Sequence, residues 1–193
     1  TTRPMEIEKK SFEIIKGELG EEFVSRYPAD ALPVLCRVIH TTADFSYRDT
    51  LTITEGAIGL AKEAIHRGLP IITDTTMAAS GINKTAARKF GIDVHCFIGN
   101  EDVKEAAKAS GMTRSAVSAE KAARLYSECI YAVGNAPTAL MRLYELIEEK
   151  KIRPALIIGV PVGFVNVVEA KELILRTDVP AIVARGRKGG SNI

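Results

Sequence analysis

Three short segments of the chain combine glycine with proline or basic residues at points where helices or strands should end. They are residues 134–138 (GNAPT), 159–164 (GVPVGF) and 185–191 (RGRKGGS), and the second and third each follow an apolar, strand-like run. Glycine lets a backbone approach a ligand closely, and Arg and Lys side chains bind anionic groups. Because ligands of open α/β sheets bind outside the carboxyl ends of the strands, these segments predict an anion-binding site at such an edge.

His40 is the residue that could turn such a binding site into a catalytic one. It lies at the end of an amphipathic stretch, in a chain with only three histidines. Histidine changes charge near neutral pH, so it can donate or accept a proton during catalysis. The alternative is a structural role, in which histidine satisfies the last carbonyl groups of a helix and complements the helix dipole. The structural alternative is stronger for His66 and His95, which lie at a polar helix end and in a strand-like run.

Two further residues fit a ligand site but also have structural explanations. Asp74 ends a strand-like run, and carboxylates at that position serve either as ligands or as helix caps. Arg114 stands at the expected start of a long helix, where an arginine and a helix N-terminus together favour anions, although it could also be an ordinary surface arginine. Gly134 and Asn135 can likewise be explained as the C-cap of one helix and the N-cap of the next.

Several motifs that define common enzyme classes are absent from the sequence. Residues 159–163 lack the GK[ST] that completes a P-loop, and no GxGxxG dinucleotide fingerprint, HExxH or GxSxG occurs. The three cysteines are scattered without a CxxC, which argues against a zinc site or a disulfide framework. The residues alone therefore predict a site for an anionic small molecule, without a metal, and leave the reaction open.

The composition is that of an ordinary globular protein. Of the 193 residues, 46% are hydrophobic and 26% are charged, and the net charge is +2. This balance provides no field that would attract nucleic acid, and no apolar run reaches the length that spans a membrane. The first eight residues are polar and charged and show no signal peptide, so we expect a cytoplasmic location and no nucleic-acid or membrane partner.

Helices and strands are expected to alternate over most of the chain. Strands separated by helices imply βαβ units, so we predict an α/β fold: a single three-layer domain over residues 1–193, with a mostly parallel sheet and helices on both faces. Residues 51–53 are too short to assign, and Asp30, Thr54, Asn100 and Asn135 are the expected helix caps. Apolar periodicity predicts helices at 5–18, 31–41, 55–67, 83–90, 101–109, 115–133, 136–150 and 166–175, and strands at 69–73, 93–98, 155–160 and 181–184.

Taken together, the motifs resemble those of the precorrin-8X methylmutase family of cobalamin biosynthesis, called cobalt-precorrin-8 methylmutase in the anaerobic branch. The resemblance covers about residues 7 to 191, and the order and spacing of the matching stretches are specific even though each stretch is short. The matching stretches are residues 11–12 (SF), 38–40 (VIH), 74–77 (DTTM), 113–115 (TRS), 134–140 (GNAPTAL), 159–165 (GVPVGFV) and 185–191 (RGRKGGS).

The resemblance implies an isomerase that shifts a methyl group from C-11 to C-12 of a corrinoid ring, giving hydrogenobyrinic acid or its cobalt form, cobyrinic acid. It implies no cofactor, because the methyl group never leaves the substrate in this acid-assisted 1,5-sigmatropic shift. The family's catalytic histidine falls on His40, which as imidazolium would protonate or hydrogen-bond the ring system. The resemblance also implies a homodimer with the cleft near the interface. The implied substrate-binding residues are Ser11, Arg114, Asp74, Met77, Asn135, Thr138, Gly163, Arg185, Arg187, Gly189, Gly190 and Ser191.

The chemistry of a corrinoid fits these residues. It is a large apolar disc rimmed by carboxylates, so it needs an apolar cleft for its face and Arg, Lys, helix N-termini or loop amides for its rim. Arg114, Arg185, Arg187 and Lys188 could supply the rim contacts. A non-catalytic corrinoid-binding protein on the same scaffold is the alternative, since family members usually continue with another helix after the position of Ser191. A nucleotide-binding α/β enzyme is a third hypothesis, against which the missing fingerprint argues.

Overall fold

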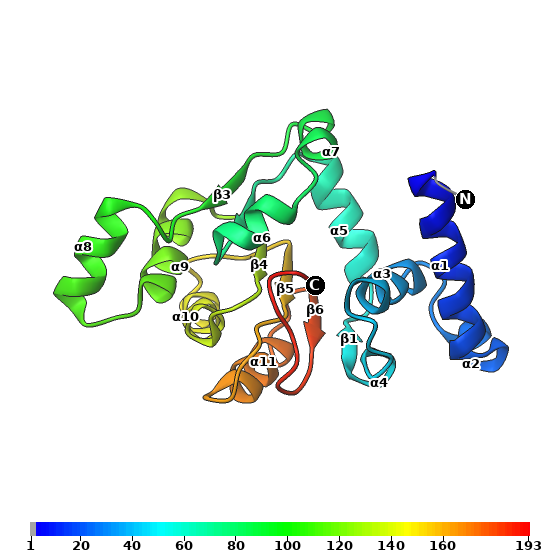
Figure 1. Ribbon diagram of the computed structural model, residues 1–193. Coiled ribbons are helices and arrows are strands. Elements are labelled where there is room, and N and C mark those ends of the chain that lie inside the picture. Colours follow the sequence, from blue (N-terminus) through cyan, green and yellow to red (C-terminus); the bar gives the residue numbers. More distant parts are fainter. Residues whose placement is uncertain (1–2) are drawn as a thin grey trace. The chain divides into compact units, whose positions relative to one another are not determined.

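The computed structural model describes residues 3–193 and divides the chain into two compact units (Figure 1). The first unit ends at Leu51 and includes Ile193, and the second runs from Thr52 to Asn192. The predicted organisation as a single domain over residues 1–193 stays a prediction, and its first two residues lie outside the described part of the chain.

The first unit consists of short and medium-length helices. The helices predicted at 5–18 and 31–41 are confirmed with small shifts at their ends, and Gly20 is the C-cap residue of the first. The expected cap at Asp30 is wrong, because the N-cap residue is Ala31 and no side chain caps that helix. Two helices of six and four residues were not predicted, since they are too short to show a period. The helices are α1 (Pro4–Leu19), α2 (Glu21–Arg26), α3 (Leu32–Thr42) and α4 (Tyr47–Thr50).

Packing of α1 on α3 forms the core of the first unit. Ile15 and Leu19 of α1 are buried, as are Leu35 and Ile39 of α3. These residues recur at the three- and four-residue spacings that place apolar side chains on one face of a helix. Burying the two faces against each other fixes which residues of α1 lie opposite the last turn of α3.

The second unit is built on a six-stranded sheet with the order β1-β6-β5-β4-β2-β3. The four pairings β2–β3, β2–β4, β4–β5 and β5–β6 are all parallel, as the βαβ pattern predicts. Parallel neighbours end at the same edge, so the carboxyl ends of β2, β4, β5 and β6 lie side by side. The strands are β1 (Leu51–Ile53), β2 (Ile71–Thr73), β3 (Val94–Cys96), β4 (Ile130–Val133), β5 (Leu156–Gly159) and β6 (Ala181–Ala184).

Helices cover both faces of this sheet, so the predicted α/β layering is confirmed. Figure 1 shows α9, α10 and α11 on one side of the central strands and α5 on the other. The main core lies between the sheet and the first group, where Tyr131, Leu140, Leu143, Ile157 and Val183 are fully buried. The helices of this unit are α5 (Ala57–His66), α6 (Thr76–Gly81), α7 (Lys84–Lys89), α8 (Glu101–Ser110), α9 (Arg114–Leu125), α10 (Pro137–Glu148) and α11 (Val167–Leu175).

The long helix predicted at 115–133 is confirmed for its first part only, and its end is wrong. Helix α9 ends at Leu125, and the apolar residues from Ile130 to Val133 form the central strand β4. A strand that is buried on both faces has no polar alternation, so its apolar run looks like the continuation of a buried helix. Gly134 therefore follows a strand rather than ending a helix, and all three glycine segments come directly after strands.

Two of the residues expected to cap helices in this unit make no capping hydrogen bond. Helix α5 begins after Gly56, so the predicted Thr54 cap is wrong. The Thr54 hydroxyl instead accepts a hydrogen bond from Ala181 N at 2.9 Å, which ties the end of β1 to the start of β6. Asn100 is the N-cap residue of α8 as predicted, but its side chain makes no capping hydrogen bond.

Within residues 3–193, no helix has the length and apolarity needed to cross a membrane.

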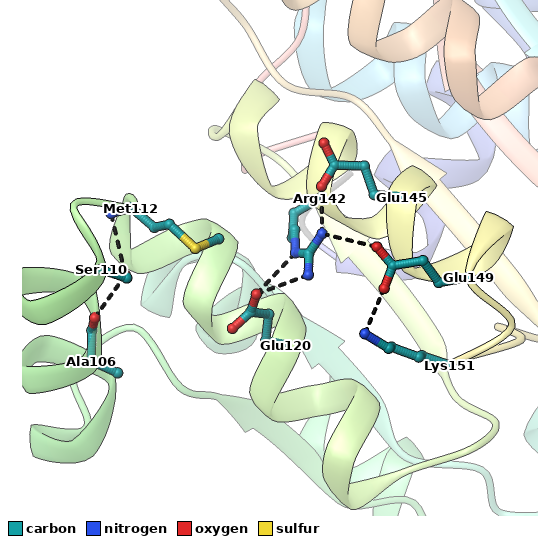
Figure 2. Close-up of polar contacts among 8 residues, drawn as sticks. All are labelled: Ala106, Ser110, Met112, Glu120, Arg142, Glu145, Glu149 and Lys151. Atoms are coloured by element: carbon teal, nitrogen blue, oxygen red, sulfur yellow. Dashed lines mark hydrogen bonds and ion pairs between the residues drawn. The ribbon is translucent and has the colours of Figure 1, made fainter.

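A network of charges centred on Arg142 joins α10 to α9 (Figure 2). The guanidinium of Arg142 binds Glu120 of α9 at 3.0 Å and also contacts Glu145 and Glu149, and Lys151 binds the other side of Glu149. The Arg142 side chain is only 19% exposed, so water screens these interactions less than it screens ordinary surface ion pairs. The network therefore fixes the position of α10 against α9, the closest-packed pair of helices in this unit.

We expect Arg142→Met to lower the free energy of unfolding by about 2 kcal/mol, between the values for exposed and buried pairs, because it leaves three carboxylates without their shared cation. Urea denaturation of the variant measures the change. Arg153→Met is the matched control, because Arg153 and Asp178 form a well-exposed pair whose loss should cost less than about 1 kcal/mol. Equal losses in the two variants would contradict the structural role of the network.

Candidate functional site

The ends of four neighbouring strands bring most of the predicted ligand residues to one edge of the sheet. Asp74 follows β2, and residues 134–138, 160–166 and 185–191 follow β4, β5 and β6. Because β6-β5-β4-β2 is a continuous parallel order, these segments are neighbours in space although more than 100 residues separate the first from the last. This edge is where open α/β sheets bind ligands.

Asp74 organises the segment that follows β4. Its buried carboxylate accepts three backbone hydrogen bonds, from Gly134 N at 2.9 Å to Oδ1 and from Asn135 N and Ala136 N at 2.8 Å to Oδ2. These N–H groups belong to the turn between β4 and α10, which begins at Pro137, so Asp74 holds this turn from the neighbouring strand. The predicted Asn135 cap is wrong: Ala136 is the N-cap residue, and the Asn135 side chain is exposed. The helix-cap alternative for Asp74 is wrong too, because Thr75 is the N-cap residue of α6 and no side chain caps α10.

The segment after β6 is bonded across the segment after β5. Gly190 N donates to Val160 O at 2.8 Å, and Gly163 N donates to Arg187 O at 3.1 Å. The Ser191 hydroxyl then lies 2.8 Å from the hydroxyl of Thr75, which caps α6. The chain end is therefore attached to the segments after β5 and β2.

Two glycines allow these segments to pack backbone against backbone. A Cβ atom at Gly134 would lie 2.6 Å from Ser191 Cα, and one at Gly189 would lie 2.2 Å from Val160 O. No side chain fits at these distances, so glycine is needed here for the contact between segments. Their positions in the sequence motifs are thus explained by packing, independently of any ligand.

The basic residues at this edge differ in how firmly their side chains are held by neighbouring groups. Arg185 is held by Glu172 of α11 through two hydrogen bonds of 2.8 and 2.7 Å, the bidentate arrangement typical of arginine and carboxylate. The Arg187 guanidinium lies over the ring of Phe164 at 5.5 Å, a cation–π contact that leaves its N–H donors available. Arg187 is therefore better suited than Arg185 to bind an anion directly.

Arg114 occupies the first position of α9, next to the start of another helix. The hydroxyl of Thr113 caps α9 by accepting from Ala116 N at 3.2 Å, and it donates to the Thr138 hydroxyl in the first turn of α10 at 3.0 Å. The Arg114 side chain is exposed, and within the described chain it forms no ion pair. An arginine beside two helix N-termini provides the anion-binding environment that the sequence predicts.

Apolar side chains are unusually exposed at the same edge. Phe164 is 81% exposed and Met77 65% exposed, and Val162 and Val165 are also exposed. Met77 follows β2 and the other three follow β5. Exposed apolar groups of this kind, flanked by arginines, are typical of surfaces that bind a ligand or another protein.

A cavity lies at the opposite edge of the sheet. It has a volume of about 440 Å³ and is lined by residues that precede β4, β5 and β6, such as Glu128, Ala155 and Pro180. Both of its cations are already paired, Arg67 with Glu128 and Arg153 with Asp178. The cavity therefore offers no free cation for an anionic ligand.

His40 and Ser11, both predicted as site residues, are brought together within the first unit. His40 is exposed in the last turn of α3, and its Nδ1 atom lies 3.1 Å from Ser11 Oγ on α1. The edge of the His40 ring also meets the ring of Phe12, with the two centres 5.8 Å apart. These contacts orient the imidazole while leaving the rest of it open to solvent.

Two charged residues beside this pair were not predicted from the sequence. Arg37 binds Glu8 at 2.6 Å and its guanidinium lies 5.1 Å from the centre of the Phe12 ring. The hydrogen bond from Arg37 holds the pKa of Glu8 below its usual range, and the positive charge of His40 acts in the same direction. Helical spacing could have revealed both residues, because Glu8 precedes Ser11 by three positions and Arg37 precedes His40 by three.

The other histidines have the structural roles that the sequence favours. His95 Nε2 lies 2.9 Å from the Tyr126 hydroxyl, and its ring stacks on Phe97 at 5.7 Å. His66 packs edge-on against Phe90 at 5.3 Å. Among residues 3–193, no group of His, Cys, Asp and Glu side chains is arranged to hold a metal ion.

The fold and these segments define a parallel α/β protein whose basic and glycine-rich segments gather at the carboxyl edge of its sheet. A family model described as precorrin-8X methylmutase matches residues 6–193. The chain belongs to the precorrin-8X methylmutase family.

Sequence similarity to individual relatives extends over most of their length and agrees with this assignment. The chain is 43% identical to a cobalt-precorrin-8 methylmutase of Leptospira interrogans, covering 97% of this chain and 87% of the relative. It is 40% identical to a cobalt-precorrin-8 methylmutase of Priestia megaterium, covering 100% and 84%. The crystal structure of a precorrin-8X methylmutase from Thermus thermophilus superimposes with a TM-score of 0.84 at 38% identity, covering 96% of this chain and 90% of that one.

We expect Asp74→Asn to reduce the free energy of unfolding by about 2 kcal/mol. The new side-chain oxygen can keep two of the three backbone bonds, but its NH₂ group would face the N–H of the third residue, and the charge on the acceptor is lost. Chemical denaturation measures the change, with Asp178→Asn as the exposed control of the same chemistry. If both variants were equally stable, the role of Asp74 in holding the turn before α10 would be rejected.

We expect Gly189→Ala to destabilise the protein by about 1–3 kcal/mol, because the added methyl group forces the segments after β5 and β6 apart. Gly59→Ala is the matched control: Gly59 lies in α5 with open space around its Cβ position, so alanine should stabilise the helix by about 0.5–1 kcal/mol. Thermal unfolding measures the Tm of both variants, which we expect to fall for Gly189→Ala and to rise for Gly59→Ala. A shift of the Tm in the same direction in both variants would refute the packing argument.

Proposed function

We propose that the chain is a methylmutase that moves a methyl group from C-11 to C-12 of precorrin-8X or cobalt-precorrin-8, giving hydrogenobyrinic acid or cobyrinic acid. The observation that carries the proposal is the match over residues 6–193 to a family whose relatives are named for this activity. The names of these relatives favour an enzyme over the alternative of a non-catalytic corrinoid-binding protein.

His40 is the proposed general acid. In the imidazolium form both ring nitrogens donate, so the Ser11 hydroxyl accepts from Nδ1–H across 3.1 Å and Nε2–H is left for the ring system of the substrate. Proton donation from a positioned histidine raises the rate of a reaction by about 10²–10⁴-fold. Because the product is an isomer of the substrate, any proton that His40 donates must return after the methyl group has moved.

The carboxyl edge of the sheet is the proposed binding surface for the corrinoid. The apolar side chains of Met77, Val162, Phe164 and Val165 suit the face of the ring, and Arg187 suits the carboxylates of its rim. Further rim contacts are proposed for Arg114 and for the loop residues and helix starts nearby, including Asn135, Thr138, Gly163, Gly190 and Ser191. We propose that Asp74 and Arg185 act by holding these segments in place, and that the missing side chain of Gly189 lets them pack.

The homodimer and the cytoplasmic location are parts of this proposal that rest on the resemblance and the composition. Exposed apolar side chains on α1, at Ile7 and Ile14, support the burial of this face against a second copy. The proposed reaction needs no cofactor, because the methyl group stays on the substrate throughout.

We expect His40→Ala to lower kcat by at least about 100-fold, because the proton donor is lost, while the Kd for hydrogenobyrinic acid changes by less than about threefold. Conversion of precorrin-8X followed by absorbance gives kcat, and an absorbance titration with hydrogenobyrinic acid gives Kd. His66→Ala is the control, since that ring packs on Phe90 at a polar helix end.

Three results would contradict the proposal in different ways. Conversion at the normal rate by His40→Ala would reject His40 as the acid but leave the methylmutase activity in place. Absence of both conversion and binding in the unaltered protein would reject the corrinoid substrate itself. Tight binding without conversion by the unaltered protein would favour the non-catalytic alternative.

A further inference from the structure

Lys171 is a fully buried cation beneath the segment that follows β6. It lies in α11 with 0% of the residue exposed. Its ammonium group donates to the carbonyl oxygens of Gly186 at 2.8 Å and of Lys188 at 2.9 Å. Within residues 3–193 it forms no ion pair, and the adjacent Glu172 binds Arg185 instead. Figure 1 shows this red segment passing α11 before it turns back along the sheet.

A buried ammonium without a counter-ion is costly, so its presence requires an explanation. Burial lowers the pKa of Lys171 to about 8, which shows the cost of keeping the charge away from water. A leucine or methionine would fill similar space without that cost. The two hydrogen bonds to Gly186 and Lys188 are what the ammonium provides and an apolar side chain cannot.

These bonds set the direction of two peptide groups. The structure contains no cis peptide bond among its described residues, and in a trans peptide the C=O and N–H groups point in opposite directions. With the carbonyls of Gly186 and Lys188 directed at Lys171, the N–H groups of Arg187 and Gly189 point away from α11. Neither N–H donates to another group within the described chain, whereas the intervening carbonyl of Arg187 accepts from Gly163 N.

The arrangement favours a negative charge on the far side of the segment. Two free N–H groups aimed outward can donate to the two oxygens of a carboxylate, and the ammonium beneath them adds positive potential in a region of low dielectric. The Arg187 guanidinium lies on the same segment and has no carboxylate partner among residues 3–193.

We propose that Lys171 is a positioning residue for ligand binding: it holds residues 186–189 so that the N–H groups of Arg187 and Gly189 bind a carboxylate on the rim of the ligand. Lys171 itself does not touch the ligand. The inference rests on the proposed corrinoid site, and it adds the residue and the backbone groups by which one carboxylate is recognised.

The test compares Lys171→Met with Lys62→Met, an exposed lysine of α5 that undergoes the same chemical change. We expect Lys171→Met to raise the KM for precorrin-8X and the Kd for hydrogenobyrinic acid by at least about tenfold, with kcat at saturation within about threefold of normal. Lys62→Met should change none of these. If Lys171→Met does not fold, Lys171→Gln is the second variant, because it keeps an N–H donor but loses the charge. We expect it to raise KM and Kd by a smaller factor, again with kcat nearly unchanged.

The unaltered protein gives a second measurement. On titration with hydrogenobyrinic acid, the amide NMR signals of Arg187 and Gly189 are expected to move, while that of Gly59 in α5 stays in place. An unchanged Kd in the Lys171 variants, or fixed Arg187 and Gly189 signals at saturation, would overturn the inference and leave the methylmutase proposal standing. Failure of the unaltered protein both to bind and to convert would instead remove the proposed function and the inference with it.

Discussion

The carboxyl edge of the sheet depends on one interaction, the three hydrogen bonds from the backbone of residues 134–136 to the carboxylate of Asp74. A buried carboxylate is tolerated only where donors replace its water, and the turn before α10 supplies three. The bonds attach the end of β2 to the turn between β4 and α10. Ser191 packs on Gly134 and contacts Thr75, so the last segment of the chain is built on the same anchor.

From this anchor the edge is assembled mostly by backbone groups. The segments after β5 and β6 bond to each other at Val160 and Gly163, and Lys171 supports the second of them from below. Contacts of this kind leave little room for side chains, which explains the glycines at 134 and 189. The side chains that remain, among them Phe164 and Arg187, project from a rigid base and pay little conformational entropy when they bind a ligand.

Sequence patterns were sufficient for the parts of this structure that depend on local chemistry. Residues 181–184 were predicted as a strand with its observed ends, and the glycine segments marked the edge of the sheet. The boundary between α9 and β4 failed because the strand is buried on both faces and shows no alternation. The contacts of Asp74 could not be predicted for another reason: its partners lie at least 60 residues away, and no periodicity in the sequence reports such a contact.

The same limit explains why Lys171 escaped prediction. In the sequence it stands in an apolar helical run, where a lysine is ordinarily expected to reach solvent with its charged end. Only the fold places the segment after β6 over it and removes the water. A sequence usually satisfies local rules and global packing together, and the positions that break a local rule are often those used for function. Lys171 breaks the rule that a charged group stays in water or has a counter-ion, and Phe164 breaks the rule that a large apolar side chain is buried. Lys171 supports the segment after β6, and Phe164 stands on the adjoining segment after β5. Stability alone favours neither residue, whereas a site for an apolar ring with acidic substituents gives a reason for both.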